Sequence, residues 1–261
     1  LSPNVVTFIC ILKACASIGY LEMGEEIHER VMKLGIIEKD IVVGTAIVDM
    51  YAKCGMLGKA QQVFDELPVQ NIVSWNALIA GYVDHEYVEQ GLRCFEQMQD
   101  NGLSPNSVTF ICILNACRII KDLDKGKQIH EEVVSRGLLE KDIGIGFALV
   151  DMYANCGLLA KAQEVIDLFS CVGRFDKAIG LIEKVSISSH RLPLWWALLG
   201  ACCKWVNVEV GRWAFEQSLK LNGNYASIYV CMRNIYAAAG MHEEANDVEC
   251  WRIRNESLEM P

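Results

Sequence analysis

Proline is scarce in this sequence, with 5 among 261 residues, and there is no excess of positive charge. Scarce proline leaves long helices uninterrupted, and apolar residues recur at helical spacing, so the sequence predicts an all-α protein. The formal net charge of −9 argues against loose, charge-driven binding to nucleic acid. Any binding of nucleic acid would therefore need a local groove and specific base contacts.

The patterns of a disulfide framework, a membrane span and common enzymes are also missing. None of the 12 cysteines forms a Cys-x-x-Cys pair, and most lie in apolar helical patterns, which is typical of reduced core thiols. The longest uncharged apolar stretch, Leu192 to Cys203, contains Pro193 and is too short for a span of about 20 residues. No phosphate-binding loop or dinucleotide fingerprint occurs. We therefore expect no membrane association, no cofactor and no catalytic site.

The sequence does contain a long internal repeat. The segment Leu-Ser-Pro-Asn at 1–4 returns at 103–106, and the match continues at a constant offset of 102 residues. A unit of that length is too long for one solenoid repeat, and it divides at three similar breaks into 5–40, 41–71 and 72–106.

Each of these pieces has the pattern of two helices. In 41–71, four apolar residues from Ile47 to Cys54 recur at i, i+3, i+4 and i+7, and Gly55 then marks a helix end. A second run of the same spacing ends at Pro68. One such hairpin cannot bury its apolar face alone, so the sequence predicts an α-solenoid in which neighbouring hairpins stack.

The rotating lengths of 36, 31 and 35 residues resemble the L, S and P motifs of plant pentatricopeptide-repeat (PPR) proteins. The L-type motif is Leu12-Lys13-Ala14-Cys15-Ala16, the S-type motif is Val48-Asp49-Met50-Tyr51-Ala52-Lys53-Cys54-Gly55, and the P-type motif is Val73-Ser74-Trp75-Asn76-Ala77-Leu78-Ile79-Ala80-Gly81-Tyr82. Residues 195–202, 207–211 and 234–240 resemble the C-terminal E extension of the PLS subfamily. The resemblance covers nearly the whole chain and implies a right-handed superhelical α-solenoid of helix-turn-helix repeats.

The resemblance also implies a division of the chain into segments. They are 1–4, the end of a preceding motif; 5–40, an L-type motif; 41–71, an S-type motif; 72–106, a P-type motif; 107–142, an L-type motif; 143–190, truncated or fused S-type motifs; and 191–261, an E-type extension of two helical hairpins. Within 156–190 part of the family pattern is missing, so one helix serves two motifs. We expect further motifs, and any organelle-targeting segment, upstream of Leu1.

The resemblance implies how the repeats would read single-stranded RNA, one base per motif. In the family, the second residue of a motif wedges against a base, and the fifth and last residues meet its Watson–Crick edge. The implied base-stacking residues are Val6, Val42, Val73 and Val108, and the implied edge-reading pairs are Thr45 with Asn71 and Asn76 with Asn106. By the family's code the first pair resembles an adenine reader, and the second resembles a pyrimidine reader that favours cytosine over uracil. Packing between helices for the valines and helix capping for the asparagines are the alternative roles.

The remaining motifs resemble weak readers. The L motifs carry Ile9 and Ile111 at the fifth position, and an isoleucine side chain cannot hydrogen-bond a base edge. The second S motif has Gly144 in place of the valine and Phe147 at the fifth position. We expect these motifs to add little base specificity.

The implied function is a sequence-specific, single-stranded RNA-binding scaffold for RNA processing in a mitochondrion or chloroplast, recognising C-to-U editing sites. The expected partner of 191–261 is a DYW-type deaminase or another editing factor acting in trans, and no DNA partner is expected.

His130-Glu131-Glu132 and His242-Glu243-Glu244 fit the first half of a zinc deaminase motif, but no Cys-x-x-Cys follows either. The acidic charge favours a protein-binding scaffold as the alternative, although such tetratricopeptide arrays repeat at a steady 34 residues or so. A degenerate fragment without a specific RNA target is the third interpretation.

Overall fold

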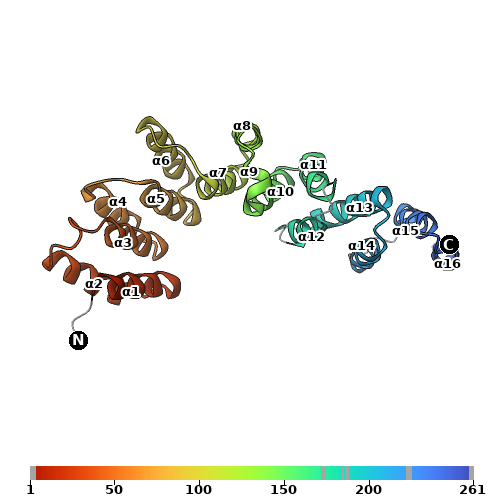
Figure 1. The fold of residues 1–261 in the computed structure, drawn as a ribbon, viewed down its shortest axis with the longest axis horizontal. Helices are drawn as coiled ribbons and strands as arrows, with labels where there is room; N and C mark the ends of the chain where they lie inside the picture. Colours follow the sequence, from red (N-terminus) through yellow and green to blue (C-terminus); the bar gives the residue numbers. More distant parts are fainter. Residues whose placement is uncertain (1–3, 172–174, 184, 186–187, 222–224, 259–261) are drawn as a thin grey trace. The chain divides into compact units, whose positions relative to one another are not determined.

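The computed structural model describes residues 4–171, 175–183, 185, 188–221 and 225–258. Over these residues the regular structure is helical throughout, and the chain forms two compact units, Leu1–Ile129 and His130–Pro261 (Figure 1). The predicted all-α solenoid of helical hairpins is confirmed. The expected end of a preceding motif at 1–4 falls largely on residues 1–3, which lie outside the described residues.

Helices follow one another along the chain, joined by short turns and loops. In chain order they are α1 (Val5–Ile18), α2 (Leu21–Lys33), α3 (Ile41–Lys53), α4 (Leu57–Glu66), α5 (Ile72–Asp84), α6 (Val88–Asp100), α7 (Ser107–Ile120), α8 (Leu123–Ser135), α9 (Leu138–Lys141), α10 (Ile143–Asn155), α11 (Leu159–Cys171), α12 (Phe175–Glu183), α13 (Ser188–Trp205), α14 (Val208–Lys220), α15 (Ala226–Ala238) and α16 (His242–Leu258). Among the helices of the described residues, none is both long and apolar enough to cross a membrane.

The first unit has two layers of helices. The first helices of the hairpins, α1, α3, α5 and α7, pack side by side, each on the next. The second helices, α2, α4 and α6, each pack on their own partner and on the first helix of the following hairpin. Because every hairpin buries an apolar face against its neighbour, the array is stabilised by contacts between adjacent repeats.

Each first helix of this unit begins after an asparagine or aspartate that caps it. The side chains of Asn4, Asp40, Asn71 and Asn106 all accept a hydrogen bond from a backbone N–H in the first helical turn. Such caps satisfy donors that have no partner within the helix and contribute about 0.5–2 kcal/mol each. They explain why the helices start at these residues.

A glycine sets the distance between two neighbouring first helices. A Cβ atom placed on Gly81 of α5 would lie 2.5 Å from the Cβ of Ala52 in α3, well inside van der Waals contact. The two helices therefore approach one another as closely as they do because position 81 has no side chain. This close approach lies near the C-terminal ends of α3 and α5.

A histidine–tyrosine pair joins neighbouring hairpins twice, at positions 102 residues apart. His28 Nδ1 of α2 lies 3.0 Å from the hydroxyl oxygen of Tyr51 in α3, and His130 Nδ1 of α8 lies 2.9 Å from that of Tyr153 in α10. The rings of each pair also meet edge to face. Burial lowers the pKa of both histidines and raises the pKa of both tyrosines to about 12, so both pairs are neutral in the folded protein.

Acid is therefore expected to destabilise the protein through these histidines. Their folded pKa lies below the unfolded value of about 6.5, so the unfolded chain binds more protons as the pH falls. The contribution of the neutral pairs is complete above about pH 6.5 and is lost as the pH drops through the folded pKa. Urea unfolding at several pH values would measure this, with the double variant His28→Gln/His130→Gln as the control. The variant should lose less stability than the wild type on acidification, and equal losses would contradict the assignment.

The second unit contains a helix with an unusual set of neighbours. Helix α11 packs against α10, which precedes it, and also against α12 and α13, which follow it. Helices α13 and α14 then form one hairpin and α15 and α16 another, with α13 packed on α15. The predicted loss of part of a motif within 156–190 stays a prediction, and residues 172–174, 184 and 186–187 of that segment lie outside the described residues.

Candidate nucleic-acid interface

Four valines form an exposed row at the starts of the first helices. Val6, Val42, Val73 and Val108 are the second residues of α1, α3, α5 and α7, and they are 64%, 55%, 59% and 52% exposed. Because these helices lie side by side, equivalent positions on them run along one edge of the layer, and we name this set the valine row. Packing between helices, the alternative role for these residues, would bury them. Their exposure leaves these side chains accessible from outside the chain.

Two of the three asparagines predicted to read base edges, Asn71 and Asn106, cap helices, which was the alternative role. Asn71 Oδ1 accepts from the backbone N–H groups of Val73 and Ser74 at 2.9 and 3.0 Å, and Asn106 Oδ1 accepts from that of Thr109 at 3.1 Å. Capping uses only the oxygen, and no described residue accepts a hydrogen bond from either Nδ2 group. Capping therefore leaves the two N–H donors of each amide available to a ligand.

The predicted pair Asn76 and Asn106 meets in the folded chain. Asn76 Nδ2 donates to Asn106 Oδ1 at 3.1 Å, although 30 residues separate them. Asn76 is only 7% exposed, and its Oδ1 accepts from the hydroxyl of Thr109 at 2.7 Å. Sequence reasoning did not identify Thr109, which is fully buried at the third position of the following motif. The Asn-x-x-Thr spacing at 106–109, a variant of the capping-box pattern, is the signal that could have found it.

The other predicted reading residue, Thr45, has an unmet hydrogen-bonding group. Thr45 is 8% exposed, and its hydroxyl oxygen is buried without a hydrogen-bond partner among the described residues. An unsatisfied buried hydroxyl costs about 1–3 kcal/mol. Among the described residues, nothing competes for this group.

The motifs predicted to be weak readers carry apolar or helix-capping side chains at their fifth and last positions. Ile9 and Ile111 are half-buried at the fifth positions of α1 and α7. Asp40 and Asp142 cap α3 and α10, accepting from backbone N–H groups at 2.9 and 2.8 Å. The low specificity expected of these motifs stays a prediction.

The two histidine motifs that resemble half of a deaminase site do not belong to a metal-binding cluster among the described residues. His130 is engaged with Tyr153, and His242 is exposed at the start of α16. Across the described ranges, no group of three histidine, cysteine, aspartate or glutamate side chains could hold a metal ion.

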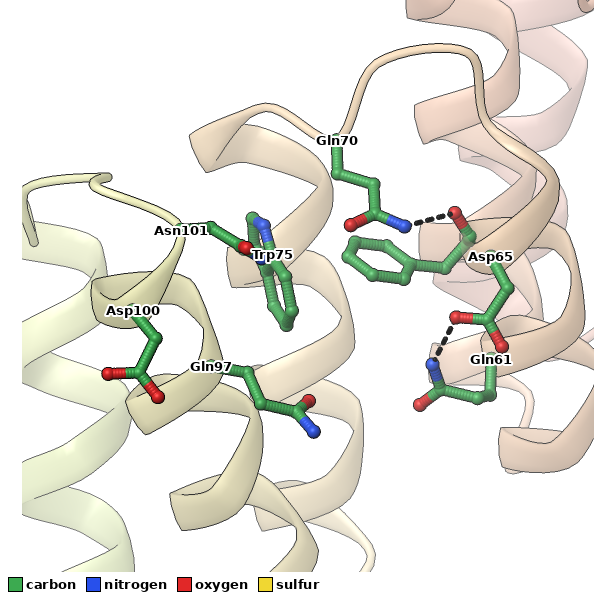
Figure 2. A pocket seen from close by; sticks show the side chains of 8 residues that line it. Gln61, Asp65, Gln70, Trp75, Gln97, Asp100 and Asn101 are labelled. Atoms are coloured by element: carbon green, nitrogen blue, oxygen red, sulfur yellow. Dashed lines mark hydrogen bonds between the residues drawn. The ribbon is translucent and has the colours of Figure 1, made fainter.

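A cavity of about 320 Å³ lies among α4, α5 and α6. Its lining residues are Gln61, Phe64, Asp65, Gln70, Trp75, Gln97, Asp100 and Asn101. Figure 2 shows Trp75 between Gln70 and Asn101, with Gln97 below it and Asp65 and Asp100 at opposite flanks. Two carboxylates disfavour a phosphate group here, so this cavity does not extend the candidate interface.

Known sequence patterns match the first unit of the chain. The pattern described as PPR repeat matches residues 6–36 and 45–72, and the one described as PPR repeat family matches residues 70–118. Among solved structures, the chain resembles the pentatricopeptide repeat protein PPR10 in complex with an 18-nt psaJ RNA element, with a TM-score of 0.43 and 17% identity over 98% of this chain and 46% of that one. PPR10 from maize gives a TM-score of 0.42 and 16% identity over 98% and 44%.

Curated relatives match almost the whole chain. A chloroplastic pentatricopeptide repeat-containing protein of Arabidopsis thaliana is 34% identical over 95% of this chain and 26% of its own length, and the chloroplastic protein CRR2 of the same plant is 34% identical over 95% and 35%. A putative mitochondrial relative, also from Arabidopsis thaliana, is 32% identical over 97% and 37%. The chain thus spans less than half the length of these relatives. The repeat matches and these relatives identify the chain as a pentatricopeptide-repeat protein of the plant type.

Proposed function

We propose that this chain is a single-stranded RNA-binding scaffold that reads bases along the first unit. The observation that carries the proposal is the valine row, four exposed apolar side chains at equivalent positions, beside the pairs Thr45/Asn71 and Asn76/Asn106. A base in single-stranded RNA has an apolar face and a polar edge. The valines suit the face, and the pairs suit the edge.

The valine row supplies one contact per motif. A β-branched side chain is stiff about χ1, so each valine presents a fixed apolar wall. Stacking of a base on an aromatic side chain is worth about 1–3 kcal/mol, and a valine contributes less. The row therefore accounts for the spacing of bases along the array, and the polar pairs account for the choice among them.

The free groups of the first pair suit adenine. Its Watson–Crick edge offers a donor, the N6 amino group, beside an acceptor, N1. The Thr45 hydroxyl can accept from N6, and the free Nδ2 of Asn71 can donate to N1. The second pair, Asn76 with Asn106, is assigned to a pyrimidine, with cytosine ahead of uracil. The motif that ends at Asn71 and the motif that ends at Asn106 would then read two successive bases.

The finer role that we propose is recognition of C-to-U editing sites in a plant organelle, by a PLS-type array with an E-type extension at 191–261. The relatives named chloroplastic or mitochondrial support an organelle. The extension would orient a DYW-type deaminase or another editing factor supplied in trans, so the chain itself acts as a scaffold. The net charge of −9 is consistent with affinity that rests on base contacts and depends weakly on salt.

The test is binding to two labelled RNAs that differ only in the order of two bases. The RNA with adenine followed by cytosine should bind about tenfold more tightly than the RNA with these bases exchanged, which is about 1.4 kcal/mol. Asn76→Ala should erode the preference at the second base and leave the preference at the first. Asn207→Ala, which removes an asparagine that caps α14 through the N–H of Val210, is the control for loss of a polar contact outside the reading pairs. Equal binding of both RNAs by folded protein would contradict base reading.

A further inference from the structure

The amide of Asn76 is held in one orientation by a chain of hydrogen bonds that starts at the backbone. The Thr109 N–H must donate to the side-chain atom of Asn106 that faces it, so that atom is Oδ1. Asn106 Oδ1 can in turn face only a donor, so the neighbouring atom of Asn76 is Nδ2, at 3.1 Å. The remaining atom of Asn76, Oδ1, then points at the Thr109 hydroxyl, 2.7 Å away.

The hydroxyl of Thr109 has one proton and is placed to give it to Asn76. Its oxygen accepts from the Asn106 backbone N–H at 3.2 Å, which completes a capping box. The proton is then free to go to the nearest acceptor, and Asn76 Oδ1 at 2.7 Å is nearer than Asn106 Oδ1 at 3.1 Å. Thr109 therefore donates to the only acceptor atom of the Asn76 side chain.

Both amide oxygens accept hydrogen bonds within the chain, so the groups of the pair that have no partner among the described residues are donors. What remains is the Nδ2 group of exposed Asn106 and the second N–H of Asn76. The edge of cytosine carries two adjacent acceptors, O2 and N3. On uracil the central position, N3, is a donor and would face another donor. A donor-only pair therefore favours cytosine over uracil.

We propose that Thr109 is a positioning residue that makes the Asn76/Asn106 pair select cytosine over uracil by holding the Asn76 oxygen away from the base. This inference rests on the proposed function, because it concerns the base read by the same pair. Thr109 is fully buried and acts through Asn76.

The neighbouring motif shows what happens without this contact. The residue equivalent to Thr109 after the Thr45/Asn71 pair is Ser74, and its hydroxyl donates to the Asn71 backbone oxygen at 2.9 Å. Within the described part of the chain, Thr45 Oγ1 then has no partner. The Thr45 hydroxyl stays free to donate or accept, whereas Asn76 is confined to donating.

The variant that tests the inference is Thr109→Val, which keeps the shape of the side chain and removes the hydroxyl. Two labelled RNAs that differ only by cytosine or uracil at the second base would be titrated against the wild type, Thr109→Val and Thr109→Ser. The ratio of the two Kd values should fall about fivefold in Thr109→Val, because Asn76 Oδ1 then loses its donor within the chain and can accept from a uracil N–H. Thr109→Ser keeps the hydroxyl and should keep the ratio.

A matched control is available in the first motif. Exposed Thr7 makes two of the same contacts with Asn4, its hydroxyl and backbone nitrogen both lying 2.9 Å from Asn4 Oδ1, but it bonds no predicted reading residue in the described ranges. Thr7→Val should therefore leave the ratio of cytosine to uracil binding unchanged. If Thr109→Val weakened binding to both RNAs equally, as a purely structural role requires, the inference would be overturned.

A second measurement separates this inference from the proposed function. In the RNA-free protein, NMR should show slower exchange of the Asn76 side-chain N–H protons in the wild type and in Thr109→Ser than in Thr109→Val. Equal exchange in all three would overturn the held orientation of the amide. If the wild type shows slow exchange of the Asn76 N–H protons but binds both RNAs equally, base reading is overturned. The role of Thr109 in selecting cytosine is then overturned as well. Wild-type discrimination that survives in Thr109→Val would overturn the role of Thr109 alone.

Discussion

Phe64→Ala is expected to lower the free energy of unfolding by about 3–5 kcal/mol, the usual range for truncating a buried aromatic side chain. Phe64 of α4 is 1% exposed, and its ring meets that of Trp75 in α5 edge to face, with centroids 4.5 Å apart. The truncation would open a void between two neighbouring hairpins, next to the cavity shown in Figure 2. Because adjacent hairpins stabilise each other, the loss should also reduce the cooperativity of unfolding. Urea unfolding followed by circular dichroism would measure both.

Two further variants separate packing from chemistry at this contact. Phe64→Leu keeps most of the volume and should cost less than about 1.5 kcal/mol. Tyr87→Ala removes an aromatic side chain that is 54% exposed, and its effect should stay within about 0.5 kcal/mol. A loss in Phe64→Ala no larger than that in Tyr87→Ala would show that the two hairpins do not pack through Phe64.

The helices could be predicted from the sequence because their ends carry local signals. Gly55 adopts a positive φ of 77° after the Cys54 cap of α3, and Pro68 follows the end of α4, as the pattern of 41–71 predicts. The starts are equally local, since the caps at Asn71 and Asn106 immediately precede α5 and α7. Apolar periodicity then determines which face of each helix is buried.

Other parts of the fold depend on packing and could not be predicted in this way. Helix α9 spans only Leu138–Lys141, too short for any periodicity to reveal. The neighbours of α11 are set by how α12 and α13 fold back on it, which no local pattern records. The sequence showed only that the family pattern is interrupted there.

The candidate site could be predicted only in part, because some of its contacts depend on packing between helices. The resemblance brought Asn76 and Asn106 together as a pair, and the structure places them in hydrogen-bond contact. From the sequence, capping and base reading were competing roles for Asn106, but in the structure capping uses only Oδ1 and leaves Nδ2 for the proposed base reading. The burial of Thr45 to 8% exposure and the contact from Thr109 were not predicted. Both depend on how closely neighbouring first helices approach, which is a tertiary property.

The double variant Val42→Asp/Val73→Asp is expected to weaken RNA binding about 100-fold, which corresponds to about 1.4 kcal/mol per valine. Each aspartate would remove an apolar wall from a base and put a carboxylate where the base stacks. The folded state should tolerate both changes, because the two valines are 55% and 59% exposed. Aspartate in a first helical turn is also favoured by the helix dipole, so the thermal stability should not fall. Fluorescence anisotropy with the adenine–cytosine RNA would measure the affinity.

The control for this prediction adds the same charge outside the valine row. Val69 and Val134 are 60% and 52% exposed, so Val69→Asp/Val134→Asp matches the double variant in residue type, exposure and net charge. Long-range repulsion of RNA phosphates acts on both variants and should cost each of them little at physiological salt, where charges are screened beyond about 8 Å. A difference of about 100-fold between them would then report contact of bases with the valine row. Equal losses in the two variants would mean that charge alone weakens binding, and the row would have no part in holding RNA.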